Sequence, residues 1–79
     1  MMVTPEEIQS YIDNNLDCDY VEVKGDGQHF EALIVSSAFL NKNRVQRHQL
    51  VYEALEGRMK AEIHALSMKT LTPEDWKNS

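Results

Sequence analysis

The hydrophobic and polar positions at the start of the chain predict an amphipathic helix. Thr4 is a suitable N-cap, Pro5 suits the first helical position, and Glu7 can complete a capping box with Thr4. Apolar side chains then recur at steps of three and four residues: Ile8, Tyr11, Ile12 and Leu16. One side of this helix is therefore expected to face a core, and Asn14 and Asn15 mark its end.

Two strands joined by a tight turn are predicted next. Residues 20–24 alternate between apolar and polar side chains, which is typical of a half-buried strand. Residues 25–27 read Gly-Asp-Gly, and these residue types connect paired strands. The run of residues 29–35 becomes almost wholly apolar after Glu31, and this predicts a central strand that is covered on both faces.

A short turn and a second helix follow. Ser36 or Ser37 can cap the turn, and Asn43 can cap the helix, with Gln46 three residues later to complete a capping box. Steps of three and four residues place one stripe of this helix toward the core: Val45, His48, Tyr52, Leu55 and Met59. Gly57 weakens the end of the helix.

The last part of the chain predicts a strand and a short helix. Residues 63–70 read as an alternating strand, and residues 72–75 (Thr-Pro-Glu-Asp) repeat the helix-start signal of residues 4–7. The order helix, strand, strand, helix, strand, short helix indicates an α+β fold, with a small three-stranded mixed sheet and helices packed on one face. Because the third strand follows a helix, it is expected to run parallel to one of the first two through a right-handed crossover.

Length and composition predict a single domain over residues 1–79. A domain of this size buries roughly 60–65% of its unfolded surface, so a deep enclosed active site is not expected. No apolar run approaches the length of a membrane span, and the N-terminus lacks a signal-peptide pattern. The lone Cys18 cannot form an internal disulfide, which fits the reducing cytoplasm.

The charge distribution bears on nucleic-acid binding. The net charge is −5, whereas a protein that binds phosphates usually carries positive charge on at least one face. Lys42, Arg44 and Arg47 form the only local basic cluster, and from the start of the second helix they could reach phosphates. A solvated helix face is the alternative, and the net charge favours it.

Histidines are the side chains best suited to metal chemistry here. His64 stands near the start of the third strand and His29 follows the Gly-Asp-Gly turn. Two ligands are too few for a closed tetrahedral site, so any metal would need further ligands from another molecule. A half-exposed strand histidine with no ligand role is the alternative for both, and His48 on the helical stripe is expected to be structural.

No enzyme motif stands out. The chain has no P-loop, nucleophile elbow or dinucleotide fingerprint. The carboxylate pairs at residues 6–7 and 74–75 sit at helix starts, where capping and the helix dipole explain them. Cys18 lies between Asp17 and Asp19, whose negative charges disfavour a reactive thiolate. We therefore expect no catalytic residues and no enzymatic activity.

Several blocks of sequence, in order, resemble the BolA family, and most closely its short bacterial members of the acid-stress type. The blocks are residues 25–30 (GDGQHF), 37–39 (SAF), 44–52 (RVQRHQLVY), 63–70 (IHALSMKT) and 72–76 (TPEDW). This resemblance implies an α+β fold similar to the class II K-homology domain, in agreement with the element order above. It covers nearly the whole chain.

The resemblance also implies a partner and a cofactor. BolA-like proteins pair with monothiol glutaredoxins, and the glutaredoxin and its glutathione supply thiolates to a shared two-iron, two-sulfur cluster. The BolA-like partner supplies the histidine that matches His64 and a second ligand from the loop between the first two strands, where His29 stands. By this resemblance the chain is expected to act in cluster trafficking and stress response. We expect it to hold no stable cluster alone and to be a monomer or a weak homodimer.

The same resemblance carries an alternative function. BolA-like proteins have been described as DNA-binding transcription regulators that use a helix-turn-helix-like segment, which spans residues 41–56 here. Lys42, Arg44 and Arg47 would then contact phosphates. Residues 40–43 contain no glycine, so the Gly-x-x-Gly loop with which K-homology domains grip nucleic acid is not present.

Overall fold

Secondary structure covers most of residues 4–26, 28–57 and 65–78, which are the residues that this computed structural model describes. The helices and strands, in chain order, are α1 (Pro5–Asn15), β1 (Tyr20–Gly25), β2 (Phe30–Val35), η1 (Ser37–Phe39, a 3-10 turn), α2 (Arg44–Ala54), β3 (Leu66–Leu71) and α3 (Pro73–Lys77). The predicted order of elements is confirmed. None of these described helices is long and apolar enough to cross a membrane.

The sheet has three strands in the order β1-β2-β3, so the apolar strand β2 is central, as predicted. The expected cover on both faces of β2 is wrong, because Glu31 on its open face is exposed. β1 pairs antiparallel with β2, and β3 pairs parallel to β2 with Phe30 opposite Leu66 and Val35 opposite Leu71. The mixed sheet predicted from the crossover is confirmed. β2 and β3 therefore begin at the same end of the sheet.

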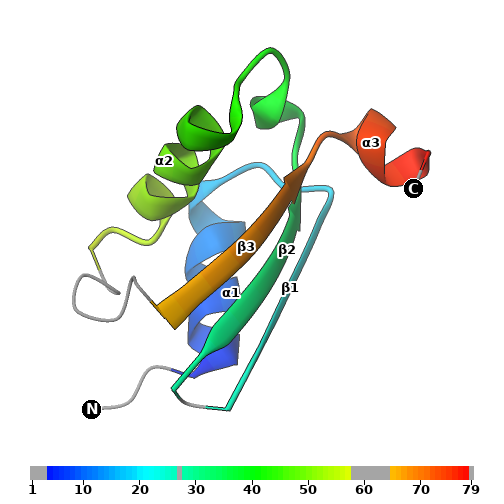
Figure 1. The fold of residues 1–79 in the computed structure, drawn as a ribbon. Helices are drawn as coiled ribbons and strands as arrows, with labels where there is room; N and C mark the ends of the chain where they lie inside the picture. The colour runs from blue at the N-terminus through cyan, green and yellow to red at the C-terminus, as the bar shows by residue number, and fades with distance from the viewer. Residues whose placement is uncertain (1–3, 27, 58–64, 79) are drawn as a thin grey trace.

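The long helices α1 and α2 cover one face of the sheet (Figure 1). Strand residues on this face alternate with residues on the open face, because side chains of a strand point to the two sides in turn. The core between sheet and helices contains ten buried residues: Ile8, Ile12, Val23, Phe30, Ala32, Ile34, Phe39, Val51, Leu55 and Leu66. This layer supplies most of the hydrophobic stabilisation.

The helix starts predicted from the sequence are all capped. The Thr4 side chain accepts from the Glu7 N–H, and the Ser36 side chain caps the 3-10 turn. Asn43 with Gln46, and Thr72 with Asp75, form complete capping boxes. These caps satisfy backbone N–H groups that have no partner inside the helix.

The predicted core stripe of α2 is wrong in its first two turns. Val45 is 66% exposed and His48 and Tyr52 are only half-buried, whereas Val51, Ala54 and Leu55 are buried. The inward position of the first turn is held by Arg47, whose guanidinium packs over the Phe39 ring at 5.9 Å. Arginine is normally taken to face solvent, so the apolar pattern did not include Arg47. The predicted core face of α2 is therefore rotated away from the observed one. Met59 lies outside the described residues.

The short helix α3 extends from the end of β3 (Figure 1). Its Trp76 ring stacks on the ring of Tyr20, with centroids 5.1 Å apart and planes 15° apart. Tyr20 pairs with Val35 and points to the open face, because its neighbour Val21 points to the helices. The stack therefore lies over one end of the sheet face that α1 and α2 leave uncovered.

Candidate functional site

His29 lies in the turn between β1 and β2, one residue before Phe30, and its side chain is exposed. Asp26 organises this turn: its Oδ1 accepts the N–H groups of Gln28 and His29, each at 2.9 Å. The Asp26 N–H in turn donates to the His29 carbonyl oxygen at 3.2 Å. The hydrogen bonds from the backbone of His29, and then of Gln28, hold the pKa of Asp26 below its ordinary value. The imidazole is thus solvent-accessible on a hydrogen-bonded turn.

Gly25 allows this turn to close against the core. A Cβ at this position would lie 2.5 Å from Cδ1 of Phe30 and 2.7 Å from the carbonyl oxygen of His29. No side chain fits so close to backbone, so only glycine permits this approach. Gly25, which helped to predict the turn, therefore also allows the observed backbone position of His29.

The second predicted ligand, His64, lies outside the described residues. The strand predicted for residues 63–70 is observed from Leu66 to Leu71, and Ala65 immediately precedes it. The pairing of Phe30 with Leu66 puts the beginning of β3 beside the end of the turn that carries His29. His29 and Ala65 thus precede paired residues at one end of the sheet.

The described residues around His29 do not form a complete metal site. No group of three or more His, Cys, Asp or Glu side chains within residues 4–26, 28–57 and 65–78 is arranged to hold a metal ion. A shallow depression at the turn is lined by His29, Asp26 and Glu31, with Lys24 and Gly25. Imidazole is a suitable ligand for iron, and this exposed ring can approach a metal whose other ligands belong to a second protein.

A second depression, the α2–β3 groove, lies between the start of α2 and β3. It is lined by Lys42, Arg44, Arg47, His48, Met68, Lys69 and Thr70. It gathers four of the chain's eight Lys and Arg residues, and none of the described lining residues is acidic. The sequence cluster contained Lys42, Arg44 and Arg47 but missed Lys69, which joins it only because β3 lies beside α2.

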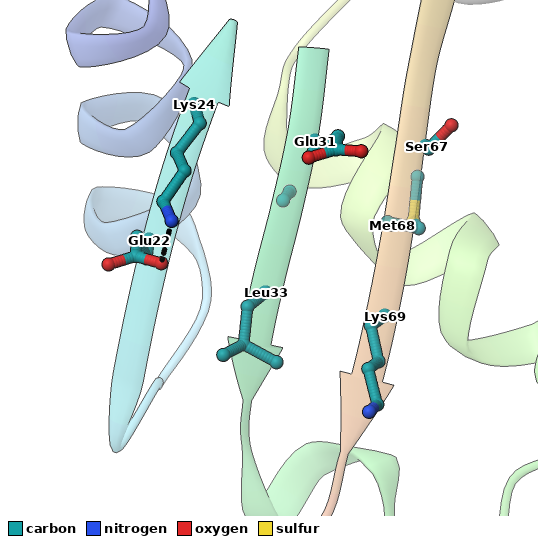
Figure 2. Close-up of a pocket in the computed structure, with 8 residues that line it drawn as sticks. Glu22, Lys24, Glu31, Leu33, Ser67, Met68 and Lys69 are labelled. Atoms are coloured by element: carbon teal, nitrogen blue, oxygen red, sulfur yellow. Dashed lines mark ion pairs between the residues drawn. The ribbon is translucent and has the colours of Figure 1, made fainter.

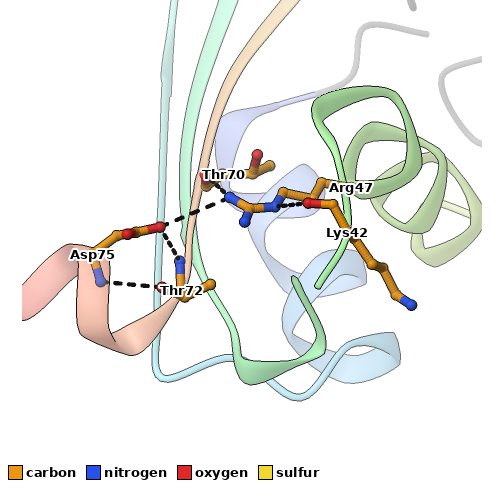
Figure 3. Close-up of polar contacts among 5 residues, drawn as sticks. All are labelled: Lys42, Arg47, Thr70, Thr72 and Asp75. Carbon is orange, nitrogen blue, oxygen red and sulfur yellow. Dashed lines mark hydrogen bonds and ion pairs between the residues drawn. The ribbon is translucent and has the colours of Figure 1, made fainter. Parts of the chain in front are cut away.

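The cations of the α2–β3 groove differ in their contacts with the rest of the protein. Arg47 is hydrogen-bonded to the backbone: its Nε donates to the Lys42 carbonyl oxygen at 2.9 Å and its Nη1 to the Thr70 carbonyl oxygen at 3.1 Å (Figure 3). Nη1 also lies 3.9 Å from Oδ2 of Asp75. The side chains of Lys42 and Arg44 are exposed. They are therefore better placed than Arg47 to contact a ligand.

Asp75 joins this network from α3. Its carboxylate accepts the Thr72 N–H at 3.2 Å, and its own N–H donates to the Thr72 hydroxyl at 3.1 Å (Figure 3). The hydrogen bonds with Thr72, and then the Arg47 guanidinium, lower the pKa of Asp75. The network ties the start of α2, the end of β3 and the start of α3 together.

His48 and Cys18 belong to no cluster of metal-ligating side chains within residues 4–26, 28–57 and 65–78. His48 is half-buried at the wall of the α2–β3 groove, and burial, followed by the charge of Arg44, lowers its pKa. Burial and the nearby aspartates raise the pKa of Cys18 to about 11. A thiol with so high a pKa is protonated and weakly nucleophilic at neutral pH, as expected from its acidic neighbours.

The open face of the sheet carries mixed charge. Figure 2 shows the side chains that line its central depression, with Glu22 and Lys24 on β1, Glu31 and Leu33 on β2, and Ser67 and Lys69 on β3. Lys24 Nζ lies 3.7 Å from Glu22 Oε1. Because these charges nearly balance, this face offers less selectivity for an anion than the α2–β3 groove.

The comparisons with known proteins agree with this fold. The chain is 42% identical to the acid stress protein IbaG of Escherichia coli over 71 residues, which cover 89% of this chain and 84% of that protein. It is 44% identical to the DNA-binding transcriptional regulator BolA of Haemophilus influenzae over 54 residues, which cover 68% of this chain and 52% of that protein. The chain therefore spans about half the length of the Haemophilus relative.

A solved structure and a family model extend the comparison. The structure of a BolA protein homologue from Coxiella burnetii superimposes with a TM-score of 0.83 at 42% identity, covering 96% of this chain and 99% of that one. The family model described as BolA-like protein matches residues 5–75, which include every helix and strand described above except the end of α3. The chain belongs to the BolA-like family.

Proposed function

We propose that this protein is a non-enzymatic adaptor that binds a monothiol glutaredoxin and co-ligates a two-iron, two-sulfur cluster between the two proteins. The glutaredoxin and its glutathione supply thiolates, and this chain supplies imidazole from His64 and from His29. The complex would act in iron–sulfur cluster trafficking and in the response to stress, in a reducing compartment such as the cytoplasm.

The accessible imidazole of His29 is the observation that supports this proposal most directly. The ring stands on a turn fixed by Asp26 and is exposed to an approaching partner. The parallel pairing of Phe30 with Leu66 adds support, because His64 precedes Leu66 by two residues and His29 precedes Phe30 by one. Membership of the BolA-like family agrees with an adaptor role.

Mixed ligation suits a cluster that is to be passed on. Replacing thiolate with neutral imidazole removes negative charge from the cluster and raises its reduction potential. For His29, the hydrogen bond from its backbone N–H to Asp26 holds the backbone from which the imidazole projects.

The partnership is tested by mixing the protein with a cluster-loaded monothiol glutaredoxin and separating the mixture by size-exclusion chromatography. We expect a heteromeric peak that contains both chains, iron and acid-labile sulfide. Prior removal of iron with a chelator should shift both proteins to their separate elution volumes. Co-elution at the same level without iron would show that the two proteins interact without a cluster and would contradict shared ligation. Absence of co-elution would contradict the whole proposal.

DNA binding is a second candidate function, favoured by the α2–β3 groove. This groove concentrates four cationic side chains in a chain of net charge −5, and the Haemophilus relative is named a DNA-binding transcriptional regulator. Lys42 and Arg44 would contact phosphates, with Arg47 holding the groove in shape. Binding should weaken steeply with salt, because the release of counterions drives it. Absence of any retarded DNA at low salt would rule this candidate out.

A further inference from the structure

The two edges of the sheet are protected to different degrees. At the β1 edge, the side-chain Oε1 of Gln9 accepts the N–H of Val23 at 3.3 Å, so α1 covers the middle of this strand. At the β3 edge, the corresponding contact is at the end of the strand, where Arg47 donates to the Thr70 carbonyl oxygen. An edge strand with free N–H and C=O groups is a template for another strand.

Among the described residues, Met68 has backbone groups at the β3 edge without a hydrogen-bond partner on the outer side. The Leu71 carbonyl accepts from the Ser36 N–H on the β2 side, whereas the Thr70 carbonyl accepts from Arg47 on the outer side. Because backbone groups of successive strand residues point to opposite sides, the N–H and C=O of Met68 point outward with those of Thr70. No group within the described residues hydrogen-bonds to Met68 on this outer side.

The outward side of Met68 faces a basic depression. Met68 and Thr70 form the β3 wall of the α2–β3 groove, and the exposed cations Lys42, Arg44 and Lys69 surround them. A ligand that follows the β3 edge would therefore meet free backbone groups and positive side chains together. An extended peptide with carboxylate side chains complements both, because its backbone continues the sheet and its carboxylates pair with the cations.

We propose that the outer edge of β3 is a docking site for an extended acidic segment of a partner protein, which adds beside β3 as a fourth strand. The backbone of the segment pairs with Met68, and its carboxylates contact Lys42, Arg44 and Lys69. A nucleic acid has no peptide backbone with which to continue the ladder of hydrogen bonds. This interaction is independent of cluster ligation and would compete with DNA for the same groove.

A synthetic probe tests the proposal on the intact protein. The probe is a fluorescein-labelled octapeptide in which pairs of Glu alternate with pairs of Thr, so that both faces of the added strand carry carboxylates. Its binding is followed by fluorescence anisotropy and by amide chemical shifts of the protein. We expect saturable binding with the largest amide shifts at Met68 and Thr70. The same peptide with N-methyl groups on alternate residues keeps its charge but loses the backbone N–H donors along one edge of the strand. Its affinity should fall at least about tenfold, or about 1.4 kcal/mol.

Charge-reversal variants test whether the peptide binds in the α2–β3 groove. Arg44→Glu and Lys69→Glu should each weaken the parent peptide by about tenfold or more, whereas Lys24→Glu on the open face should leave its affinity within about twofold. Equal binding of the parent and N-methylated peptides would overturn strand addition. The proposal would also be overturned if a single-stranded oligodeoxynucleotide of the same net charge bound more tightly than the peptide. The same holds if Lys24→Glu reduced the affinity for the peptide as much as Lys69→Glu.

Discussion

Arg47 Nη1 donates to the carbonyl oxygen of Thr70 at 3.1 Å, and this hydrogen bond joins the first turn of α2 to the end of β3. The same guanidinium donates to the carbonyl oxygen of Lys42 at 2.9 Å. A planar side chain with several fixed donors can hold two carbonyl groups of different segments at once. Arg47 is therefore a structural residue at the floor of a basic groove, and its loss should be measured first as a change in stability.

Substitution Arg47→Ala is expected to lower the free energy of unfolding by about 1–3 kcal/mol, because two backbone acceptors lose a charged donor. Arg47→Lys should recover only part of this loss, since an ammonium group cannot reproduce the planar fork. Urea unfolding followed by circular dichroism measures both. The matched control is Arg44→Ala, an exposed neighbour, for which a change within about 0.5 kcal/mol is expected. Equal unfolding midpoints for the two alanine variants would contradict the structural role.

The stack of Trp76 on Tyr20 is expected to hold α3 against the open face of the sheet. Trp76→Ala should lower the free energy of unfolding by about 1 kcal/mol beyond the loss of buried area, since stacked aromatic pairs contribute this amount. The chain has one tryptophan, so its fluorescence reports directly on the stack. Tyr20→Ala should shift the emission of Trp76 to longer wavelength in the folded protein. An unchanged emission spectrum would show that the two rings do not pack in solution.

The half-buried ring of His48 makes stability depend on pH. Burial, followed by the charge of Arg44, lowers the pKa of His48 from its ordinary 6.5, so the folded state binds this proton more weakly than the unfolded state. The stability associated with the neutral ring is present above pH 6.5 and is lost as the pH falls through the lowered folded pKa. Between pH 8 and pH 5, wild type should thus lose more stability than His48→Asn. Parallel pH profiles of unfolding for the two proteins would contradict this account.

Cys18 should be slow to react in the folded protein. Burial, and then Asp13, Asp17 and Asp19, raise the pKa of its thiol from 9.0 to about 11. Since the thiolate is the nucleophile, alkylation by iodoacetamide at pH 8 should be about 100-fold slower than in the urea-unfolded chain. Asp19→Asn should accelerate the reaction of the folded protein. Equal rates in the folded and unfolded states would contradict a protected thiol.

Local chemistry allowed most of the fold to be predicted from the sequence. The caps at Thr4, Asn43 and Thr72 act on residues three positions away. A short stretch of sequence therefore contains both partners, and the cap can be predicted without knowledge of the fold. The apolar run of β2 predicted a central strand, and β2 does lie between two neighbouring strands.

Features that depend on tertiary contacts were harder to predict. Arg47 replaces an apolar residue on the inner face of α2 through hydrogen bonds to a strand 23 residues away, and a pattern of apolar positions cannot contain that information. Lys69 joins the basic cluster only through the packing of β3 beside α2. The proposed ligand role of His29 rests on the resemblance to the BolA family, and the structure adds the turn that fixes its backbone.

We propose that this chain supplies imidazole ligands to a cluster shared with a glutaredoxin. The most direct measurement is the visible circular dichroism of the isolated complex with a cluster-loaded monothiol glutaredoxin, compared among single alanine variants of the chain's three histidines. His64→Ala should change the spectrum most and His29→Ala should also change it, whereas the groove variant His48→Ala should match wild type. A spectrum that is the same for all four proteins would contradict the account.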